Sequence, residues 1–360
     1  MRRRKSFGEF IMRCRKINLF VWMLVAGGIA ACQPAANDGP PKEGVAAFYD
    51  GRIIRWIIPY SPGGGYDKYG RLIAPYLEKY TGARVDIVNL PGAGGMRGVN
   101  EIFNARNDGL TIGMMNGSAL VANELAGMRG ADYEIGEFEY LGRVVADARV
   151  FVLSLESGYT TFEDIWRLGN GVKIGATGLG GSTYVDAVIA NQALEMDLDI
   201  IHGFDSSSVV RQAMLRGNIV GTWGSWGSAV ESVDQGRDKI VLQSGNKRRA
   251  DLLDVPTVFE LAEKLENPER AIAILKAWEA LQAVGRPVAA PPGTAADKVQ
   301  FLSEALDKAL NDPELLEIAG STGRPVDHLS AAEMRQVFDN AFVMPDDVRD
   351  LFARAIQGEL

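Results

Sequence analysis

Two strand-like segments in the first third of the chain each end in Pro-Gly and a glycine cluster, and a helix-like pattern follows each cluster. The segments are Ile54-Arg-Trp-Ile-Ile-Pro-Tyr-Ser-Pro-Gly-Gly-Gly-Tyr-Asp67 and Val85-Asp-Ile-Val-Asn-Leu-Pro-Gly-Ala-Gly-Gly95. Glycine permits tight turns and leaves room for a ligand beside backbone amide groups. The start of a helix adds unpaired N–H groups and a partial positive charge. The two loops therefore predict a cradle for a carboxylate or a phosphate.

These glycine loops lack the signatures of nucleotide-binding and hydrolase motifs. A dinucleotide fingerprint needs a glycine at its sixth position, where the three candidate loops have Lys68, Arg97 and Thr183. Lys68 is followed by Tyr69 and not by Ser or Thr, which excludes a P-loop, and no Gly-x-Ser-x-Gly elbow is present. The alternative interpretation is that the loops are only tight turns between strand and helix.

The first 32 residues have the organisation of a bacterial lipoprotein signal peptide. Seven Arg and Lys residues precede an apolar run, Leu19 to Ala26, which is too short for a permanent membrane span. The run leads to Ile29-Ala-Ala-Cys32, which resembles a lipobox with Cys32 as the lipidated residue, and Met12 is an alternative start. Residues 33–47, rich in Pro and Gly, are expected to form a flexible tether. An ordinary secretory peptide is the alternative.

Charge and composition exclude several functions. The leader carries seven basic residues and one acid, so removing its charge of +6 from the total of −8 leaves about −14 for the mature chain. So acidic a protein is a poor candidate for binding nucleic acid or anionic lipid. Cys14 is lost with the leader, Cys32 is expected to be acylated, and two histidines, His202 and His328, cannot form a zinc site alone. We therefore expect no metal, no cofactor and no disulfide.

Strand-like and helix-like segments alternate along the rest of the chain, and about 310 residues suit two lobes. Such alternation predicts an α/β fold with parallel sheets, in which ligands bind at the carboxyl ends of strands. The chain becomes mostly helical after Pro256. The expected strands are Ile53–Pro59, Arg84–Asn89, Leu110–Met115, Tyr140–Val145, Val150–Leu155, Val172–Ala176, Ile219–Trp223, Lys239–Gln243 and Arg286–Ala290.

The second half of this alternation contains another glycine loop, Gly175-Ala-Thr-Gly-Leu-Gly-Gly-Ser-Thr183, before a helix expected over Tyr184–Leu194. Ser182 or Thr183 can cap that helix and offer a hydroxyl to a ligand. Asp205 or Ser206 is expected to cap the next helix, Val209–Leu215. Capping alone would explain these residues. Two tryptophans, Trp223 and Trp226, follow at a strand end, where a role in the core and a role in ligand contact are both open.

Taken together, these segments resemble the receptors of tripartite tricarboxylate transporters, the TctC-type or Bug family. The similarity spans roughly residues 52 to 345, in order and at family-like spacing. It rests on Pro59-Tyr-Ser-Pro-Gly-Gly-Gly-Tyr-Asp67, Asn89-Leu-Pro-Gly-Ala-Gly-Gly95, Asp108-Gly-Leu-Thr-Ile-Gly113, Gly175-Ala-Thr-Gly-Leu-Gly-Gly-Ser182, Asp254-Val-Pro-Thr-Val258, Pro291-Pro-Gly-Thr294 and Leu310-Asn-Asp-Pro313.

This resemblance implies a periplasmic-binding-protein-like fold with two Rossmann-like α/β lobes, a two-segment hinge and a cleft between the lobes. It places residues 48–147 and 250–360 in lobe 1 and residues 148–249 in lobe 2. It further implies a periplasmic receptor without catalytic activity that passes a small organic carboxylate to membrane transporter subunits, and the lipobox-like leader adds the expectation of a lipid anchor at Cys32. We expect this receptor to be a monomer.

The expected ligand-binding residues lie in the glycine loops and at strand ends of both lobes. Many relatives have a small residue where Tyr66 stands, and a lysine-containing stretch where this chain reads Ile201-His-Gly-Phe-Asp-Ser206, which favours a ligand with one or two carboxylates and an apolar or aromatic body over citrate. The candidates are Tyr60, Ser61, Gly64, Gly65, Tyr66, Asp67, Gly92, Ala93, Gly94, Gly95, Ser118, Gly180, Gly181, Ser182, Thr183, Phe204, Asp205 and Trp223.

Two alternatives remain open on sequence alone. An enzyme acting on a carboxylate could use the same cleft, although the sequence shows no nucleophile–base pair, metal cluster or cofactor motif. A ligand sensor for a signalling complex would have the same fold and site. The carboxylate is expected between the loops at Ser61–Asp67 and Gly92–Met96, held by amide N–H groups directly or through water. Asp67 is expected to cap the helix, hold a water or meet a ligand donor, and not to contact the carboxylate as an anion.

Overall fold

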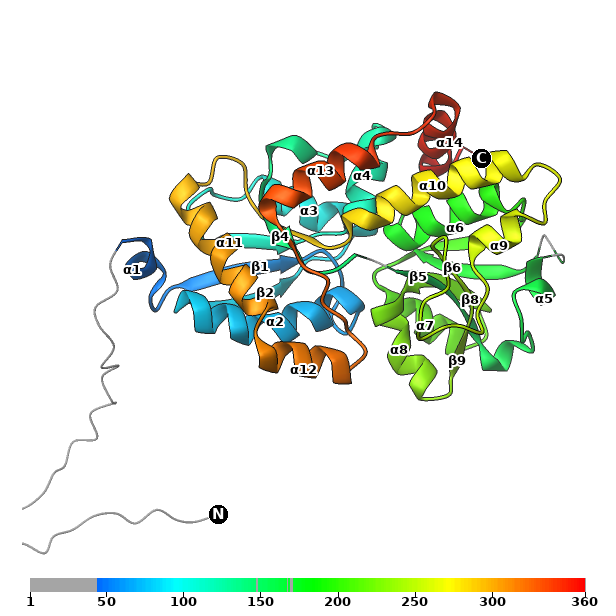
Figure 1. Cartoon of the computed structure of the whole chain (residues 1–360), viewed down its shortest axis with the longest axis horizontal. Helices are drawn as coiled ribbons and strands as arrows, with labels where there is room; N and C mark the ends of the chain where they lie inside the picture. The colour runs from blue at the N-terminus through cyan, green and yellow to red at the C-terminus, as the bar shows by residue number, and fades with distance from the viewer. Residues whose placement is uncertain (1–43, 147, 167, 169–170, 360) are drawn as a thin grey trace, which may run out of the picture. The chain divides into compact units, whose positions relative to one another are not determined.

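The computed structural model describes residues 44–146, 148–166, 168 and 171–359, and these contain two separate β-sheets with helices on both faces of each (Figure 1). The predicted signal peptide and Cys32 lie outside the described residues. Helix α1, Val45–Tyr49, begins inside the segment predicted as a tether. None of the helices in the described part of the chain is long and apolar enough to cross a membrane.

The first sheet combines strands from the beginning and the end of the chain. Its order is β11-β4-β10-β3-β1-β2, where β1 runs parallel to β2 and β3, and β10 runs antiparallel to β3 and β4. The expectation of a parallel sheet is therefore wrong for β4, β10 and β11, because these strands do not follow one another through single crossover helices. The strands are β1 Ile53–Ile58, β2 Arg84–Asn89, β3 Thr111–Met114, β4 Glu139–Arg143, β10 Pro287–Ala290 and β11 Leu329–Ser330.

Alternation along β1 divides the core of the first sheet into two layers. Ile54, Trp56 and Ile58 join the cluster under α2 and α11, whereas Ile57 joins the cluster on the opposite face, as the period of two in a strand requires. Helices α3 and α13 contact the strands of this sheet as well. The helices are α2 Gly65–Thr81, α3 Met96–Phe103, α4 Gly117–Leu125, α11 Ala296–Leu310, α12 Pro313–Ser321 and α13 Ala331–Ala341, with 3₁₀ turns at Ala93–Gly95 and Ile135–Glu137.

The second sheet has the order β7-β6-β8-β5-β9, with β6 parallel to β7 and β8, and β5 antiparallel to β8 and β9. Its edge strand β7 was not predicted from the sequence, because its residues are mostly exposed and give no apolar run. The strands are β5 Arg149–Ser154, β6 Lys173–Thr177, β7 Asp199–Phe204, β8 Gly221–Ser225 and β9 Asp238–Gln243.

Helices α7 and α8 contact the strands of the second sheet and share a core cluster with them, while α6 packs against the sheet and against α10 and α14. Helix α10 also contacts α4 and α13, which belong to the first sheet's helices. The chain thus returns from β9 to β10 through α9 and α10, and the lobe boundaries near 147 and 250 remain a prediction. The helices are α5 Glu163–Trp166, α6 Ser182–Ala193, α7 Ser207–Leu215, α8 Trp226–Asp234, α9 Val258–Ala262, α10 Pro268–Val284 and α14 Asp346–Gln357, with a 3₁₀ turn at Leu155–Ser157.

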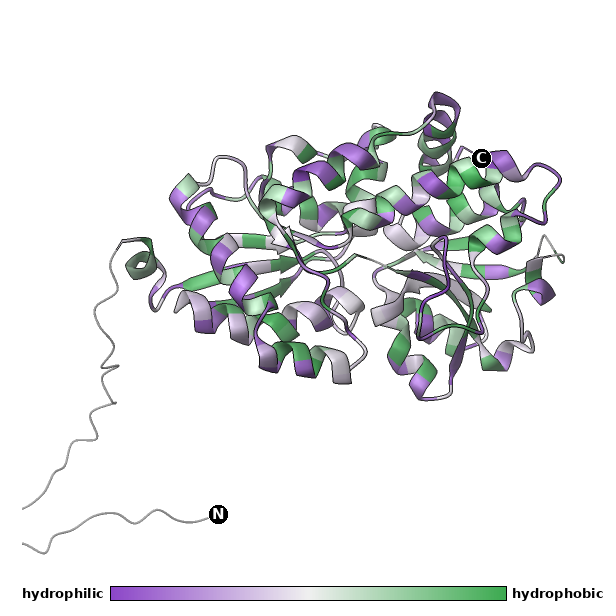
Figure 2. Cartoon of the chain, in the orientation of Figure 1, coloured by the Kyte–Doolittle hydropathy of each residue, from purple (hydrophilic) through white to green (hydrophobic). Residues whose placement is uncertain are grey.

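Hydropathy follows this layered arrangement. Most helices carry both purple and green residues in Figure 2, as expected for helices with one face on a core and one in water. Of the two predicted caps in the second lobe, the one for α7 is confirmed, since the Ser206 side chain accepts the N–H of Val209. The other is wrong, because Gly181 is the N-cap of α6 and makes no side-chain hydrogen bond there. Thr183 instead accepts the N–H of Thr177 at 2.7 Å.

Candidate ligand site between the two sheets

A small polar cavity lies where the first glycine loop meets the second sheet's helices. We call this cavity the cradle, and it encloses about 30 Å³. Most of its side chains carry hydroxyl groups, and most are buried. Its lining residues are Tyr60, Gly64, Gly65, Tyr66, Arg149, Thr177, Ser182, Thr183, Ser206, Ser207, Ser225 and Ser228.

Four helices begin at the cradle. Helix α2 comes from the first sheet and starts after its N-cap Gly64. The other three come from the second sheet: α6 starts at Ser182, α7 follows its N-cap Ser206, and α8 follows its N-cap Ser225. Each helix start brings N–H donors and a partial positive charge. Their convergence on one cavity makes the cradle an anion-binding environment.

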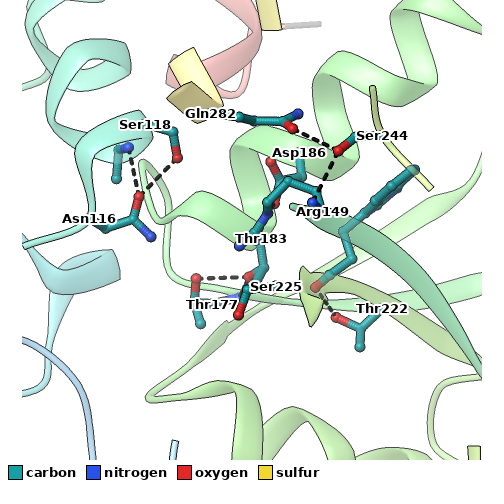
Figure 3. A network of polar contacts seen from close by, with 12 residues as sticks. Asn116, Ser118, Arg149, Thr177, Thr183, Asp186, Thr222, Ser225, Ser244 and Gln282 are labelled. Carbon is teal, nitrogen blue, oxygen red and sulfur yellow. Dashed lines mark hydrogen bonds and ion pairs between the residues drawn. The ribbon is translucent and has the colours of Figure 1, made fainter. Parts of the chain in front are cut away.

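Two buried arginines form part of the wall around these helix starts. Arg149 lines the cradle at the beginning of β5, and its Nε donates to Oδ2 of Asp186 at 2.6 Å. Ser244 Oγ accepts a hydrogen bond from the backbone N–H of Arg149 and donates one to Gln282 Oε1 (Figure 3). The indole N–H of Trp278 in α10 also donates to the Asp186 carboxylate, at 2.9 Å. Because Asp186 lies in α6, this hydrogen bond links α6 to α10.

Arg286, in the segment before β10, connects the two sides of the site. It donates to the carbonyl of Gly65 in α2 at 3.2 Å and to Ser225 Oγ at the start of α8 at 2.8 Å. Its guanidinium carbon lies 4.3 Å from the ring centroid of Tyr66 and 4.5 Å from that of Tyr69, within cation–π range. Arg286 therefore holds the first glycine loop against the second sheet.

Asp67 stabilises the first glycine loop and does not cap helix α2, whose N-cap Gly64 has no side-chain hydrogen bond. Its carboxylate accepts the N–H of Gly63 at 2.9 Å, the Nε of Arg71 at 3.0 Å and the amide of Asn89 at 3.0 Å. Burial raises the pKa of Asp67, but the hydrogen bonds from Arg71, Gly63 and Asn89 and the charge of Arg71 outweigh burial, and the pKa lies below its ordinary value. Direct contact of Asp67 with a ligand remains a prediction.

The second glycine loop contacts the other lobe and does not line the cradle. A β-carbon added at Gly94 would lie 2.5 Å from the amide nitrogen of Gly181, so the loop 92–95 packs directly on the loop 178–181. Tyr60 Oη also donates to the Gly94 carbonyl at 3.2 Å. The structure thus brings Tyr60, Gly64, Gly65, Tyr66, Ser182 and Thr183 to the cradle. Ala93, Gly94 and Gly181 belong to the contact between the loops, whereas an added β-carbon would meet Arg97 at Gly92, Tyr60 at Gly95 and Asn123 at Gly180.

The remaining predicted site residues do not line the cradle. Trp223 is fully buried, with its ring centroid 5.4 Å from that of Phe151 and 5.1 Å from that of Trp278, which corrects the interpretation of Trp223 as a cleft residue. Ser118 lies on α4 and donates to Asn116, and Asp205 is exposed. Phe204 packs on the core cluster formed by α7, α8, β5 and β9, and Ser61 lies in the loop after β1.

Sequence reasoning missed Arg149, Arg286, Ser225 and Ser228. The two arginines each stand next to an apolar strand, Arg149 before Val-Phe-Val-Leu and Arg286 before Pro-Val-Ala-Ala. A charged residue at such a position is a signal for a buried functional cation. The two serines had no comparable signal, because a serine near a helix start is explained equally well by capping.

No group of three or more His, Cys, Asp or Glu residues within residues 44–359, as far as these are described, is placed to hold a metal ion. Two β-sheets are each covered by helices, and loops from both meet over a small polar cavity. This arrangement is the fold of a periplasmic solute-binding protein.

Comparison with known proteins identifies the family. Residues 70–342 match the family described as tripartite tricarboxylate transporter family receptor, so the chain belongs to this receptor family and the predicted resemblance is confirmed. A protein of Cupriavidus necator, described as UPF0065 protein in gbd 5'region, is 25% identical over 301 residues, which cover 82% of this chain and 86% of that protein.

Solved structures confirm the predicted fold. The periplasmic binding protein BugD matches with a TM-score of 0.69 and 21% identity, covering 85% of this chain and 98% of that chain. MatC from Rhodopseudomonas palustris, solved with bound malate, matches with a TM-score of 0.68 and 19% identity, covering 84% of this chain and 99% of that chain. The two-lobed fold of these binding proteins is thus the fold of this chain.

Proposed function

We propose that this protein is an exported, non-catalytic receptor that binds a small organic carboxylate in the cradle and delivers it to a tripartite tricarboxylate-type membrane transporter. The observation that carries the proposal is the convergence of four helix starts and the buried Arg149 on one cavity. Membership of the receptor family and the malate bound to MatC support it.

The charge of the chain supports local capture of the ligand. With a net charge of −8 over the full sequence, the protein does not attract anions from a distance. Affinity must come from donors at the site, and the helix starts and hydroxyl groups supply them without a cofactor. Hydrogen bonds to a charged partner are worth about 1.5–3 kcal/mol each, so a few of them suffice for micromolar binding.

Binding is tested by a thermal-shift screen of the purified protein with mono-, di- and tricarboxylates and aromatic acids, each paired with its neutral amide. A ligand at about 100 times its dissociation constant adds roughly 2.7 kcal/mol of stability. We expect at least one acid to stabilise the protein while its amide does not. If no acid stabilises the protein, the carboxylate-receptor proposal fails.

A variant of the cradle sharpens this test. Ser182→Ala removes a buried hydroxyl that lines the cradle, and we expect at least a tenfold loss of affinity for the acid found in the screen. Ser321→Ala removes a hydroxyl in α12 that only bonds a carbonyl of its own helix, and affinity should stay unchanged. Recovery of the acid chemically intact after long incubation distinguishes a receptor from an enzyme.

Export, anchoring and delivery are separate parts of the proposal. We expect Cys32→Ser to release the protein from the membrane fraction or leave it unprocessed, and the wild-type protein to carry an acyl mass. Unchanged partitioning of the variant without an acyl mass would contradict lipidation. Cells lacking the receptor should lose uptake of the radiolabelled acid if the partner is a transporter, and keep uptake if the partner is a sensor. Light scattering should give the mass of a monomer.

A further inference from the structure

A second cavity adjoins the cradle on the side of α7 and α8. We call it the vestibule, and it has a volume of about 220 Å³. Ser228 lines both cavities, and the hydroxyl of Ser206 in the cradle lies 2.8 Å from that of Ser208 in the vestibule. The lining residues of the vestibule are Gly63, Lys68, Ser208, Arg211, Gln212, Leu215, Ser228, Glu231, Ser232, Arg237 and Asp238.

The size of the cradle requires the ligand to extend out of it. Its volume of about 30 Å³ accommodates one or two water molecules, which is also the size of one carboxylate group. Arg286 stands between the cradle and the larger cavity beside Val145, Ala146 and Ala148, because it lines that larger cavity and bonds both Gly65 and Ser225. The body of a ligand whose carboxylate lies at the helix starts is therefore directed toward the vestibule.

Arg211 is placed to meet the far end of such a ligand. It lies on α7, three residues after Ser208 and four after Ser207, and residues at these spacings share one helix face. A side chain in a helix leans toward the N-terminus, which here is the end at the cradle. Within the described residues, the Arg211 guanidinium has no hydrogen bond and no ion pair, whereas Lys68 of the same cavity is paired with Glu231.

The charges around Arg211 leave the vestibule with one net positive charge. Lys68, Arg211 and Arg237 stand against the two carboxylates Glu231 and Asp238. The pKa of Arg211 lies below its ordinary value, because burial and the charge of Arg237 lower it more than the charges of Asp238 and Glu231 raise it. An arginine stays protonated in proteins, so its donors are available to an anion and favour a planar carboxylate that accepts two hydrogen bonds.

We propose that Arg211 is the specificity-determining residue for a second carboxylate, and that the ligand is an α,ω-dicarboxylate with one end in the cradle and the other in the vestibule. This inference rests on the proposed function, since it assumes that the first carboxylate binds at the helix starts. It assigns recognition of the distal group to a residue outside the glycine loops.

The test compares α,ω-dicarboxylates with monocarboxylates of the same chain length, from four to eight carbons, by isothermal titration calorimetry. We expect the wild-type protein to bind one dicarboxylate at least about tenfold more tightly than its monocarboxylate match. In Arg211→Gln this advantage should fall to within about twofold, with unchanged affinity for the monocarboxylate. Arg216→Gln, which removes the same charge from the exposed end of α7, should leave both affinities unchanged.

Several outcomes would overturn the inference. If Arg211→Gln still binds the dicarboxylate more tightly than the monocarboxylate by the wild-type factor, a group other than Arg211 binds the distal carboxylate. Equal binding of mono- and dicarboxylates by the wild-type protein would show that no second carboxylate is recognised, while leaving the proposed function intact. Loss of monocarboxylate binding in a folded Arg211→Gln protein would place Arg211 at the first carboxylate. Absence of binding to every acid would instead count against the proposed function itself.

Discussion

Arg149 and Asp186 form an ion pair that is almost completely sealed from water, with exposed fractions of 2% and 0%. The pair stands at the wall of the cradle, and Trp278 donates a further hydrogen bond to the same carboxylate. Removing both charges from water is costly, and only the close geometry and the extra hydrogen bonds offset that cost. The pair therefore fixes the position of Arg149 more than it adds to net stability.

Asp186→Asn is expected to destabilise the protein strongly. The substitution leaves the buried Arg149 cation without its carboxylate, which costs about 3–5 kcal/mol of unfolding free energy. Urea denaturation at pH 7 measures this loss. Asp205→Asn, at an exposed position of the same lobe, should change the unfolding free energy by no more than about 0.5 kcal/mol. A loss below about 1 kcal/mol in Asp186→Asn would show that the pair is not energetically coupled.

Gly94→Ala is expected to weaken ligand binding by preventing the contact between the glycine loops. The new β-carbon would lie 2.5 Å from the Gly181 amide nitrogen and 2.6 Å from the Leu179 carbonyl oxygen, both rigid backbone atoms. Gly94 also has φ of 66°, so the variant carries backbone strain of about 1 kcal/mol. We expect at least a tenfold loss of affinity in calorimetric titration with the acid identified by the screen.

A matched glycine separates the two effects in Gly94→Ala. Gly127 has φ of 54° and nothing within 4 Å of an added β-carbon, so Gly127→Ala introduces the strain without the clash. It should lose a similar amount of stability and keep wild-type affinity. Equal affinities of the two variants would indicate that the loop 92–95 is only a turn.

The glycine loops, the fold class and the family could all be predicted from the sequence, because each depends on local patterns. Strand β1 followed by Pro-Gly-Gly-Gly and an amphipathic helix is visible in consecutive residues. The antiparallel strand β10 lies between β3 and β4 in the first sheet, more than 140 residues away along the chain from either. No local pattern encodes such a pairing, so the expectation of parallel sheets was wrong for the pairings of β10 with β3 and β4, of β11 with β4, and of β5 with β8 and β9.

The cradle itself depends on contacts between distant segments. Arg286 meets Gly65 across 221 residues, and Arg149 meets Asp186 across 37. Arg286 and Arg149 were missed from the sequence, whereas Trp223 was wrongly included among the ligand-binding residues. A tryptophan beside glycines at a strand end fits a cleft or a core equally well. Only the positions of Phe151 and Trp278 show that it belongs to the core.

The stabilising contribution of Asp67 should disappear in acid. Its folded-state pKa lies below that of an unfolded aspartate, about 3.9, so the ionised form stabilises the fold. This contribution is complete above the unfolded pKa and is lost as the pH falls through the lower, folded pKa. Asp67→Asn should therefore reduce the unfolding free energy by about 1–3 kcal/mol at pH 7, and the difference from wild type should narrow below about pH 3.9.

Urea denaturation of wild type and Asp67→Asn at pH 7, 5 and 3 measures this difference. The values at pH 7 and 5 should agree, because both lie above the unfolded pKa. A difference that is constant down to pH 3 would show that the ionised carboxylate does not hold the loop. Arg71→Gln in the Asp67→Asn background should have little further effect, since Arg71 donates to that carboxylate.

We expect substitution of Trp223 to lower stability, as for a core residue, and substitution of Tyr66 to lower ligand affinity, as for a residue of the ligand site. Trp223→Phe removes part of a fully buried ring between Phe151 and Trp278 and should lower the unfolding free energy by about 1–3 kcal/mol, with unchanged ligand affinity. Tyr66→Leu removes a ring that lines the cradle and lies under Arg286, so affinity should fall several-fold. Denaturation curves and titrations of both variants with the same acid decide the matter. A larger loss of affinity in Trp223→Phe than in Tyr66→Leu would return Trp223 to the ligand site.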